Sequence, residues 1–178
     1  MEQFDRELEL GFEVSAAQAI KIITRDNLVI THQDIIHQTW LEEGVVGDYK
    51  FRTRIRKVEG SRLDRTFIQS RKYEFTTKYS KNNEAAVKQD NIELNTRITL
   101  DEYERLKKIY EAAGKEEVVK IRSYFRSQSD PFTTYTLDTY PDEESDRARI
   151  EIEFLTEGEM KRWKAPDWLK ELIDNKKA

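Results

Sequence analysis

Arginine recurs at every second position in one short segment of the chain. Arg52, Arg54 and Arg56 alternate with Thr53 and Ile55. Successive side chains of a β-strand point to opposite faces, so the three arginines would share one face of a strand. A guanidinium offers a fork of N–H donors that matches the oxygens of a phosphate group. The spacing therefore predicts a strand that binds phosphate.

Carboxylates repeat in the same way at two distant places. Glu7 and Glu9 form one such pair, and Glu151 and Glu153 form the other. Hard divalent cations such as Mg²⁺ require oxygen ligands and do not need Cys or His. A cation held between carboxylates and a polyphosphate would neutralise charge at phosphorus and could activate water. Both acidic pairs are therefore candidate metal ligands.

Other charged residues extend the pattern along the chain. Lys120 and Arg122 would share a face, and Lys78 closes a strand that contains Phe75. On any one strand, a charged face is typical of an ordinary sheet surface that meets solvent. A solvent face usually mixes the two signs, whereas here the signs divide by strand. We therefore favour a sheet that closes on itself, with its charged faces lining a polar tunnel and its apolar faces covered by helices.

Composition excludes several other classes of protein. Charged residues make up 37% of the 178 residues, yet 11% are aromatic, which favours a folded domain with a core. The chain has no Cys and only two His, which excludes disulfides, thiolate nucleophiles, Cys-based zinc sites and a His-rich metal site. A net charge of −4 predicts no general affinity for nucleic acid. Since there is neither a long apolar run nor a signal peptide, we expect a cytoplasmic protein with no membrane partner.

The elements that must position these residues are mostly strands. Alternating or β-branched segments predict strands at residues 2–10, 35–41, 50–58, 66–79, 91–99, 118–125, 133–140 and 147–155. Glu43 and Gly44 are expected to form a turn after the second of these. Helices are predicted at residues 15–23, 100–113 and 166–173. The first would have Ser15 as its N-cap, and the second would have a Thr99–Glu102 capping box and a stop at Gly114.

Eight strands joined mostly by short turns predict an antiparallel sheet, which closes most easily as a barrel. The expected fold class is therefore α+β, an eight-stranded antiparallel β-barrel (tunnel) with a few flanking helices. We expect a single domain over residues 1–178, because the sequence has no linker or internal repeat.

The ordered series of motifs resembles the CYTH domains, or triphosphate tunnel metalloenzymes. This group includes thiamine triphosphatases, inorganic triphosphatases and class IV adenylyl cyclases. The resemblance runs from residue 7 to about residue 169. The matching segments, in family order, are Glu7-Leu8-Glu9, residues 36–41, Arg54-Ile55-Arg56, Lys78, Lys120-Ile121-Arg122, residues 137–140, Glu151-Ile152-Glu153 and residues 166–169.

The resemblance implies roles for individual residues. The implied catalytic residues are Glu7, Glu9, Lys78 and Arg56. The implied substrate-binding residues are Arg52, Arg54, Arg56, Lys78, Lys120 and Arg122. The implied metal ligands, for Mg²⁺ or Mn²⁺, are Glu7, Glu9, Glu93, Asp138, Glu151 and Glu153.

The chain departs from the family pattern at two places. The lysine of the opening signature is Gly11 here, so a residue that contacts phosphate in the family is missing. We expect Arg52, or Lys50 on the same face, to compensate, and Gly11→Lys to strengthen triphosphate binding unless the site has been reshaped. The family's Arg-x-Glu-x-Glu strand is also blurred at residues 88–97, where Glu93 is the clear carboxylate match and Lys88 or Arg97 could supply the cation.

Three functions stay open on the sequence. The first is a metal-dependent hydrolase that cleaves the phosphoanhydride of an inorganic, nucleoside or thiamine triphosphate. The second is a class IV-type adenylyl cyclase, and the third is a non-catalytic protein that binds polyphosphate or a nucleotide, which Gly11 keeps open. The expected partner is a small-molecule triphosphate or polyphosphate, with nucleic acid not expected and a homodimer left open.

Overall fold

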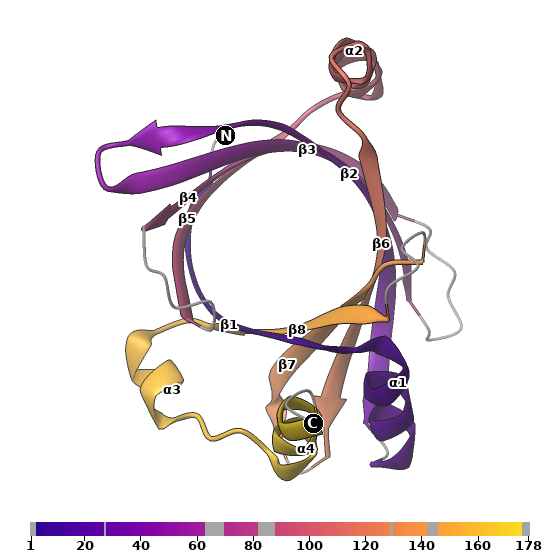
Figure 1. Ribbon diagram of the computed structural model, residues 1–178, viewed down its shortest axis with the longest axis vertical. Helices are drawn as coiled ribbons and strands as arrows, with labels where there is room; N and C mark the ends of the chain where they lie inside the picture. The colour runs from indigo at the N-terminus through magenta and orange to yellow at the C-terminus, as the bar shows by residue number, and fades with distance from the viewer. Residues whose placement is uncertain are drawn as a thin grey trace.

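The computed structural model describes residues 3–26, 28–62, 70–81, 88–128, 130–141 and 146–175. In this part of the chain, eight strands close into a barrel in the order β1-β5-β4-β3-β2-β6-β7-β8 (Figure 1). The strands are β1 (Gln3–Ser15), β2 (Val29–Val46), β3 (Tyr49–Arg62), β4 (Ser70–Lys81), β5 (Lys88–Arg97), β6 (Glu117–Ser127), β7 (Asp130–Thr139) and β8 (Arg147–Phe154). The helices are α1 (Ala16–Arg25), α2 (Leu100–Ala112), α3 (Glu157–Arg162) and α4 (Asp167–Asn175).

All neighbouring strands are antiparallel, and β1 pairs with both β5 and β8. The pairing of β1 with β8 closes the sheet, so the predicted α+β fold with an eight-stranded antiparallel barrel is confirmed. Residues 66–69, expected at the start of the fourth strand, lie outside the described residues.

The predicted turn at Glu43 and Gly44 is wrong. Strand β2 continues to Val46, and the chain turns at Gly47 and Asp48 instead. Gly47 has φ +58°, the conformation that a two-residue hairpin loop requires and that favours glycine. Gly44 serves another purpose, because a Cβ there would lie 2.6 Å from Cε1 of Phe51.

A β-bulge explains why the pattern of β2 is hard to interpret from sequence. Trp40 pairs with Arg54, but the next paired residue on β2 is Glu43, which lies opposite Arg52. Leu41 and Glu42 of β2 therefore lie opposite the single residue Thr53 of β3, so β2 has one extra residue here. The alternation of faces is interrupted there, and Glu43 comes to lie on the same face as Trp40.

The predicted helix signals are found in the structure. Ser15 caps α1 by accepting a hydrogen bond from the backbone N–H of Gln18 at 3.2 Å. Thr99 and Glu102 form the capping box of α2, and Gly114 follows that helix with φ +76°. Helix α4 starts at Asp167, next to the predicted start. Helix α3 was not predicted, and it begins with its own capping box between Thr156 and Glu159.

Helices cover the outer face of the barrel on two sides (Figure 1). The larger apolar cluster lies between β1, β7, β8 and the helices α1 and α4, and includes the fully buried Ile150, Ile152 and Leu169. The smaller one packs Tyr103 of α2 against Leu41 and Ile55. Because the apolar faces of the strands point outward to these helices, the alternate, charged faces point inward. Within the described residues, no helix is long and apolar enough to span a membrane.

Candidate active site inside the barrel

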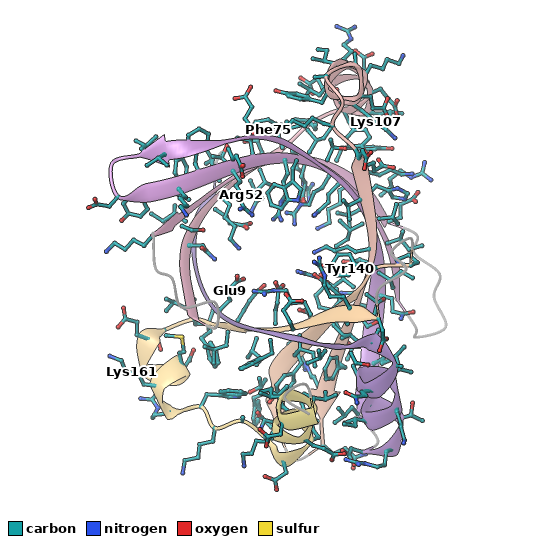
Figure 2. The ribbon with its side chains drawn as sticks, viewed as in Figure 1. Glu9, Arg52, Phe75, Lys107, Tyr140 and Lys161 are labelled. Atoms are coloured by element: carbon teal, nitrogen blue, oxygen red, sulfur yellow. The ribbon has the colours of Figure 1, made fainter. Side chains whose placement is uncertain are left out.

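Charged side chains from all parts of the barrel point into its lumen. Figure 2 shows Glu9 and Arg52 extending inward from opposite sides. The strand register explains this arrangement, since residues directly opposite each other on paired strands share a face. The register places Arg52 opposite Lys78 and Lys78 opposite Glu93. Matching charged positions on successive strands therefore form continuous bands across the inner surface.

Four residues on β3, β4 and β5 form what we call the β3–β5 wall, namely Arg54, Arg56, Lys78 and Glu93. Nη2 of Arg54 lies 3.2 Å from Oε1 of Glu93, and Nζ of Lys78 lies 3.4 Å from the same oxygen. Burial alone would raise the pKa of Glu93, but Arg54 and Lys78 lower it below its usual value. Glu93 is therefore ionised and holds two cations side by side at the lumen.

Glu74 and Asn95 lie beside the β3–β5 wall and hold its third cation, Arg56. Arg56 lies with Nη2 at 3.1 Å from Oε2 of Glu74 and donates to Oδ1 of Asn95 at 3.4 Å. Asn95 in turn donates to Oε2 of Glu93 at 3.4 Å. This wall therefore has three cations, each held in place by a carboxylate or an amide of another strand.

A second group of charged side chains faces the lumen from β6, β7 and β8, and we call it the β6–β8 wall. Its members are Lys120, Arg122, Asp138 and Glu151. Asp138 is almost fully buried and accepts from Nζ of Lys120 at 2.6 Å and from Nε and Nη2 of Arg122 at 2.6 and 2.7 Å. Burial would raise the pKa of Asp138, but the bonds from Arg122 and Lys120 lower it to about 2. Nη2 of Arg122 also donates to Oε2 of Glu151 at 2.7 Å.

Lys120 is the residue of this wall whose charge changes in the pH range just above neutrality. Burial and the neighbouring Arg122 lower the pKa of Lys120 to about 8, although Asp138 opposes the shift. The Lys120 ammonium is thus charged at neutral pH and loses its charge in mildly alkaline solution.

Glu9 and Glu153 lie where the barrel closes. They are directly opposite each other in the β1–β8 pair. Glu9 accepts from Nζ of Lys78 at 3.4 Å and from Nδ2 of Asn91 at 3.3 Å. Glu153 makes no hydrogen bond or ion pair with any residue that the structure describes. Burial raises the pKa of Glu153 and the nearby carboxylates of Glu9, Glu151 and Glu93 raise it further, while Arg122 opposes them.

The donor chemistry at this place fits a divalent cation. Like charges directly opposite each other destabilise a sheet pair, and a cation bound by both carboxylate groups would remove that repulsion. Among the residues that the structure describes, no three acidic or His side chains already form a metal-binding group. Glu7 belongs to β1, but its side chain lies outside the described part of the structure. Within the described part of the chain, Glu9 and Glu153 are the carboxylate pair that could hold such an ion.

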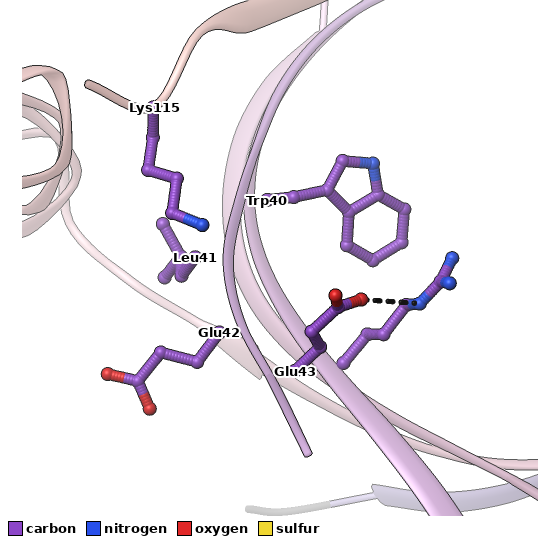
Figure 3. Close-up of a pocket in the computed structure, with 6 residues that line it drawn as sticks. Trp40, Leu41, Glu42, Glu43 and Lys115 are labelled. Carbon is purple, nitrogen blue, oxygen red and sulfur yellow. Dashed lines mark ion pairs between the residues drawn. The ribbon is translucent and has the colours of Figure 1, made fainter. Parts of the chain in front are cut away.

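Trp40 lines a pocket at one end of the barrel. The guanidinium of Arg54 lies 5.3 Å from the centre of the Trp40 ring system, and that of Arg52 lies 5.9 Å away. Arg52 is mostly exposed and pairs with Glu43 across 3.4 Å (Figure 3). Trp40, Glu43 and Arg52, with Lys115, line a pocket of about 280 Å³. Arg52 is therefore a residue of the opening rather than of the deep lumen.

A larger pocket of about 820 Å³ opens at the other end of the barrel. It is lined by residues near the start of β7, including Phe132, by residues near the end of β8, including Glu153, and by Tyr124 and Trp163. Strands β2 and β7 run in the same direction, because each pairs antiparallel with β6. The beginning of β7 and the end of β2, where Trp40 lies, are therefore at opposite ends.

The structure brings together nearly all of the predicted site residues. Glu9, Glu93, Asp138, Glu151, Glu153, Arg54, Arg56, Lys78, Lys120 and Arg122 all face the lumen, and Arg52 lies at its opening. Sequence reasoning assigned no role to Glu43, which the bulge brings to the inner face, or to Arg149, which donates to Glu151 at 2.8 Å. For Arg149 a signal was available, since it shares strand parity with Glu151 and Glu153. Of the cations suggested for residues 88–97, Arg97 is exposed and the side chain of Lys88 lies outside the described residues.

Comparison with known proteins addresses the fold. No protein-family model and no curated protein matches the sequence. Among solved structures, HpAC1 from Hippeastrum, whose structure is described as revealing a dominant triphosphatase activity, superposes with a TM-score of 0.55 at 10% identity. The match covers 96% of this chain and 88% of that one. The chain has the triphosphate tunnel fold. Two further structures match over similar lengths.

These are PH1819 from Pyrococcus horikoshii OT3 and the inorganic triphosphatase NE1496. PH1819 has a TM-score of 0.49 at 18% identity, covering 95% of this chain and 86% of that one. NE1496 has a TM-score of 0.45 at 19% identity, covering 91% of this chain and 82% of that one.

The tunnel of the present chain has cations on two facing walls and a pair of carboxylates between them. That arrangement is suited to an elongated anion that carries a metal ion.

Proposed function

We propose that the protein hydrolyses the phosphoanhydride bond of a triphosphate inside the tunnel, with Mg²⁺ or Mn²⁺ bound at Glu9 and Glu153. The observation that carries this proposal is the position of the Glu9–Glu153 pair between two walls that each present arginine and lysine side chains to the lumen. A triphosphate chain in the lumen could exchange partners with the wall carboxylates, since Arg and Lys bind phosphate oxygens as readily as carboxylate oxygens. The same fold in HpAC1, whose description names a triphosphatase activity, supports the proposal.

In the proposed reaction a water oxygen forms a bond to the terminal phosphorus. The bridging P–O bond breaks, the leaving diphosphate takes the electron pair, and the proton of the water passes to solvent. Arg54 and Lys78 would bind the oxygens of one end of the chain, and Lys120 and Arg122 those of the other. Their positions are fixed in advance by Glu93 and Asp138, so little reorganisation is needed when charge develops. A bound divalent cation would offset the negative charge shared by the carboxylates and the phosphates.

The test is an assay of phosphate release from tripolyphosphate, ATP and thiamine triphosphate, each with Mg²⁺ or Mn²⁺. We expect metal-dependent release from at least one of these, lost in Arg54→Gln and kept in Arg105→Ala. Arg105 is a suitable control, because it is an exposed arginine on α2, outside the tunnel. Formation of cyclic AMP from ATP, without release of inorganic phosphate, would favour an adenylyl cyclase. HpAC1 is itself described as a putative adenylyl cyclase. No turnover of any substrate would contradict the proposed hydrolase.

A second candidate function is a non-catalytic tunnel that binds a polyphosphate or a nucleotide. The observation that favours it is the lack of a ready group of three metal ligands in the described part of the chain. In that case tripolyphosphate would bind tightly, in a manner that depends on Arg54, but no phosphate would be released with any divalent metal. Calorimetry beside the turnover assay separates the two candidates.

A further inference from the structure

The guanidinium of Arg149 occupies the space next to Gly11. Gly11 lies opposite Glu151 in the β1–β8 pair, and Arg149 is two residues earlier on β8, on the same face. A Cβ at residue 11 would overlap Nη2 of Arg149 and lie 2.5 Å from its Cζ. The φ angle of Gly11 is not positive, so the glycine is not needed for backbone conformation. What it provides is room for the arginine.

Two carboxylates hold Arg149 in this position. Nε of Arg149 donates to Oε1 of Glu151 at 2.8 Å, and Nη1 donates to Oε1 of Glu13 at 3.2 Å. The arginine side chain is 18% exposed, so it is largely enclosed by the lumen. The opposite oxygen of Glu151 accepts from Arg122. Glu151 therefore joins two guanidinium groups and fixes both at the same part of the tunnel.

The inclusion of Arg149 changes the charge of this side of the tunnel. Without it, Lys120 and Arg122 are balanced by Asp138 and Glu151. With it, three cations face two deeply placed carboxylates, and Glu13 at the far side of Arg149 is more exposed. A phosphate group is the kind of ligand that would use the additional charge, because a guanidinium can present two N–H groups to its oxygens.

We propose that Arg149 is a phosphate-binding residue of the tunnel, admitted to the lumen by the absence of a side chain at Gly11. This inference rests on the proposed function. It also replaces the expectation that Arg52 or Lys50 compensates for Gly11. Both belong to β3, which is separated from β1 by β4 and β5, whereas Arg149 lies on the strand next to Gly11.

The experiment measures tripolyphosphate binding by calorimetry in a double-substitution cycle. We expect Arg149→Ala to weaken binding about tenfold or more, because one charge-assisted contact is lost. Gly11→Ala should weaken binding by a similar factor, since the added methyl group pushes the flexible guanidinium aside. In the Arg149→Ala background, Gly11→Ala should have almost no further effect on binding. Two residues that acted independently would instead give additive effects.

A rescue variant makes the test sharper. Gly11→Lys alone should weaken binding, since the lysine and the arginine compete for one space. Gly11→Lys combined with Arg149→Ala should bind better than Arg149→Ala alone, because a cation returns from the neighbouring strand. Arg105→Ala is the matched control for loss of one positive charge and should bind as the wild type does. If Arg149→Ala does not fold, Arg149→Gln keeps a hydrogen bond donor for Glu151 and removes the charge.

The outcomes separate this inference from the proposed function. If wild type binds tripolyphosphate, Arg54→Gln weakens binding and Arg149→Ala does not, the inference is overturned and the tunnel remains a triphosphate site. Independent, additive effects of Gly11→Ala and Arg149→Ala would overturn it as well. If wild type does not bind tripolyphosphate with or without Mg²⁺, the proposed function fails, and the inference fails with it.

Discussion

Glu9 and Glu153 face each other across the seam at which β1 and β8 close the barrel. Glu9 has Lys78 and Asn91 as partners, whereas Glu153 has no hydrogen bond or ion pair within the described part of the chain. The two residues are therefore unequal members of one acidic pair. Substitution at the two positions should have different consequences for stability, although both should affect the binding of a cation.

Glu153→Gln is expected to raise the melting temperature in the presence of EDTA, because it removes the repulsion of Glu9. It should also reduce the stabilisation that Mg²⁺ or Mn²⁺ gives to the wild type. Glu9→Gln should instead lower the melting temperature, because it breaks the ion pair with Lys78. Both variants should lose metal-supported turnover by about tenfold or more. Thermal unfolding with and without metal is the measurement, and unchanged turnover of both variants at limiting metal would contradict the metal site.

Asp138→Asn is expected to destabilise the protein by about 3 kcal/mol, because it leaves two buried cations without their shared carboxylate. Urea unfolding at neutral pH measures this change. The folded pKa of Asp138 is about 2, below its ordinary value of 3.8, so its ionised form stabilises the fold. That stabilisation is present above about pH 4 and is lost as the pH falls towards 2. The variant should lack this acid-dependent component, and a loss below about 1 kcal/mol at neutral pH would argue against the arrangement.

Triphosphate affinity is expected to fall as the pH rises through about 8, because Lys120 then loses its charge. Its folded pKa lies below its ordinary value of 10.5, so the unfolded chain holds more protons between pH 8 and 10.5. The contribution of Lys120 to folding stability therefore rises with pH over the range in which binding weakens. Calorimetry in buffers of different ionisation enthalpy should show proton uptake on binding near pH 8.5. The variant Lys120→Arg should bind without this uptake, and an unchanged uptake would assign it to another group.

Trp40 is expected to report occupancy of the tunnel. Its indole lies under Arg54, so a phosphate group bound to that guanidinium should change the fluorescence of the tryptophan. Of the other two tryptophans, Trp168 packs against Phe125, and Trp163 packs against Phe154 and lines the pocket at the far end of the barrel from Arg54. Tripolyphosphate should therefore change the emission of the wild type and leave that of Trp40→Phe unchanged. A persistent change in the variant would show that the ligand binds elsewhere.

Much of the tunnel was predictable because the sequence of a single strand shows which of its side chains share a face. Arg54 and Arg56 must share a face wherever their strand lies, and an apolar neighbour such as Ile55 decides which face is turned to the core. The capping box at Thr99 was predictable for the same reason, since its partners are three residues apart.

The parts that could not be predicted depend on contacts between distant strands. The bulge after Trp40 changes parity within one strand, and nothing in its own residues requires it. The contact between Gly11 and Arg149 depends on the register of β1 against β8, which a single strand does not encode. The sequence shows that position 11 lacks the lysine of the family signature. The side chain that occupies the space beside Gly11 belongs to Arg149, on another strand, 138 positions along the sequence.

The closure of the barrel by β1 and β8 also has a consequence for how the protein is made. These paired strands are separated by more than 130 positions, as in the hydrogen bond between Ser15 and Asp146. Bringing them together carries a large entropic cost, and the strands between them can pair earlier as hairpins. A nascent chain that has left the ribosome only as far as β7 would lack Arg149, Glu151 and Glu153. It would present the cationic strands as an open, unsealed sheet, so the tunnel can first enclose an anion only after β8 has been synthesised.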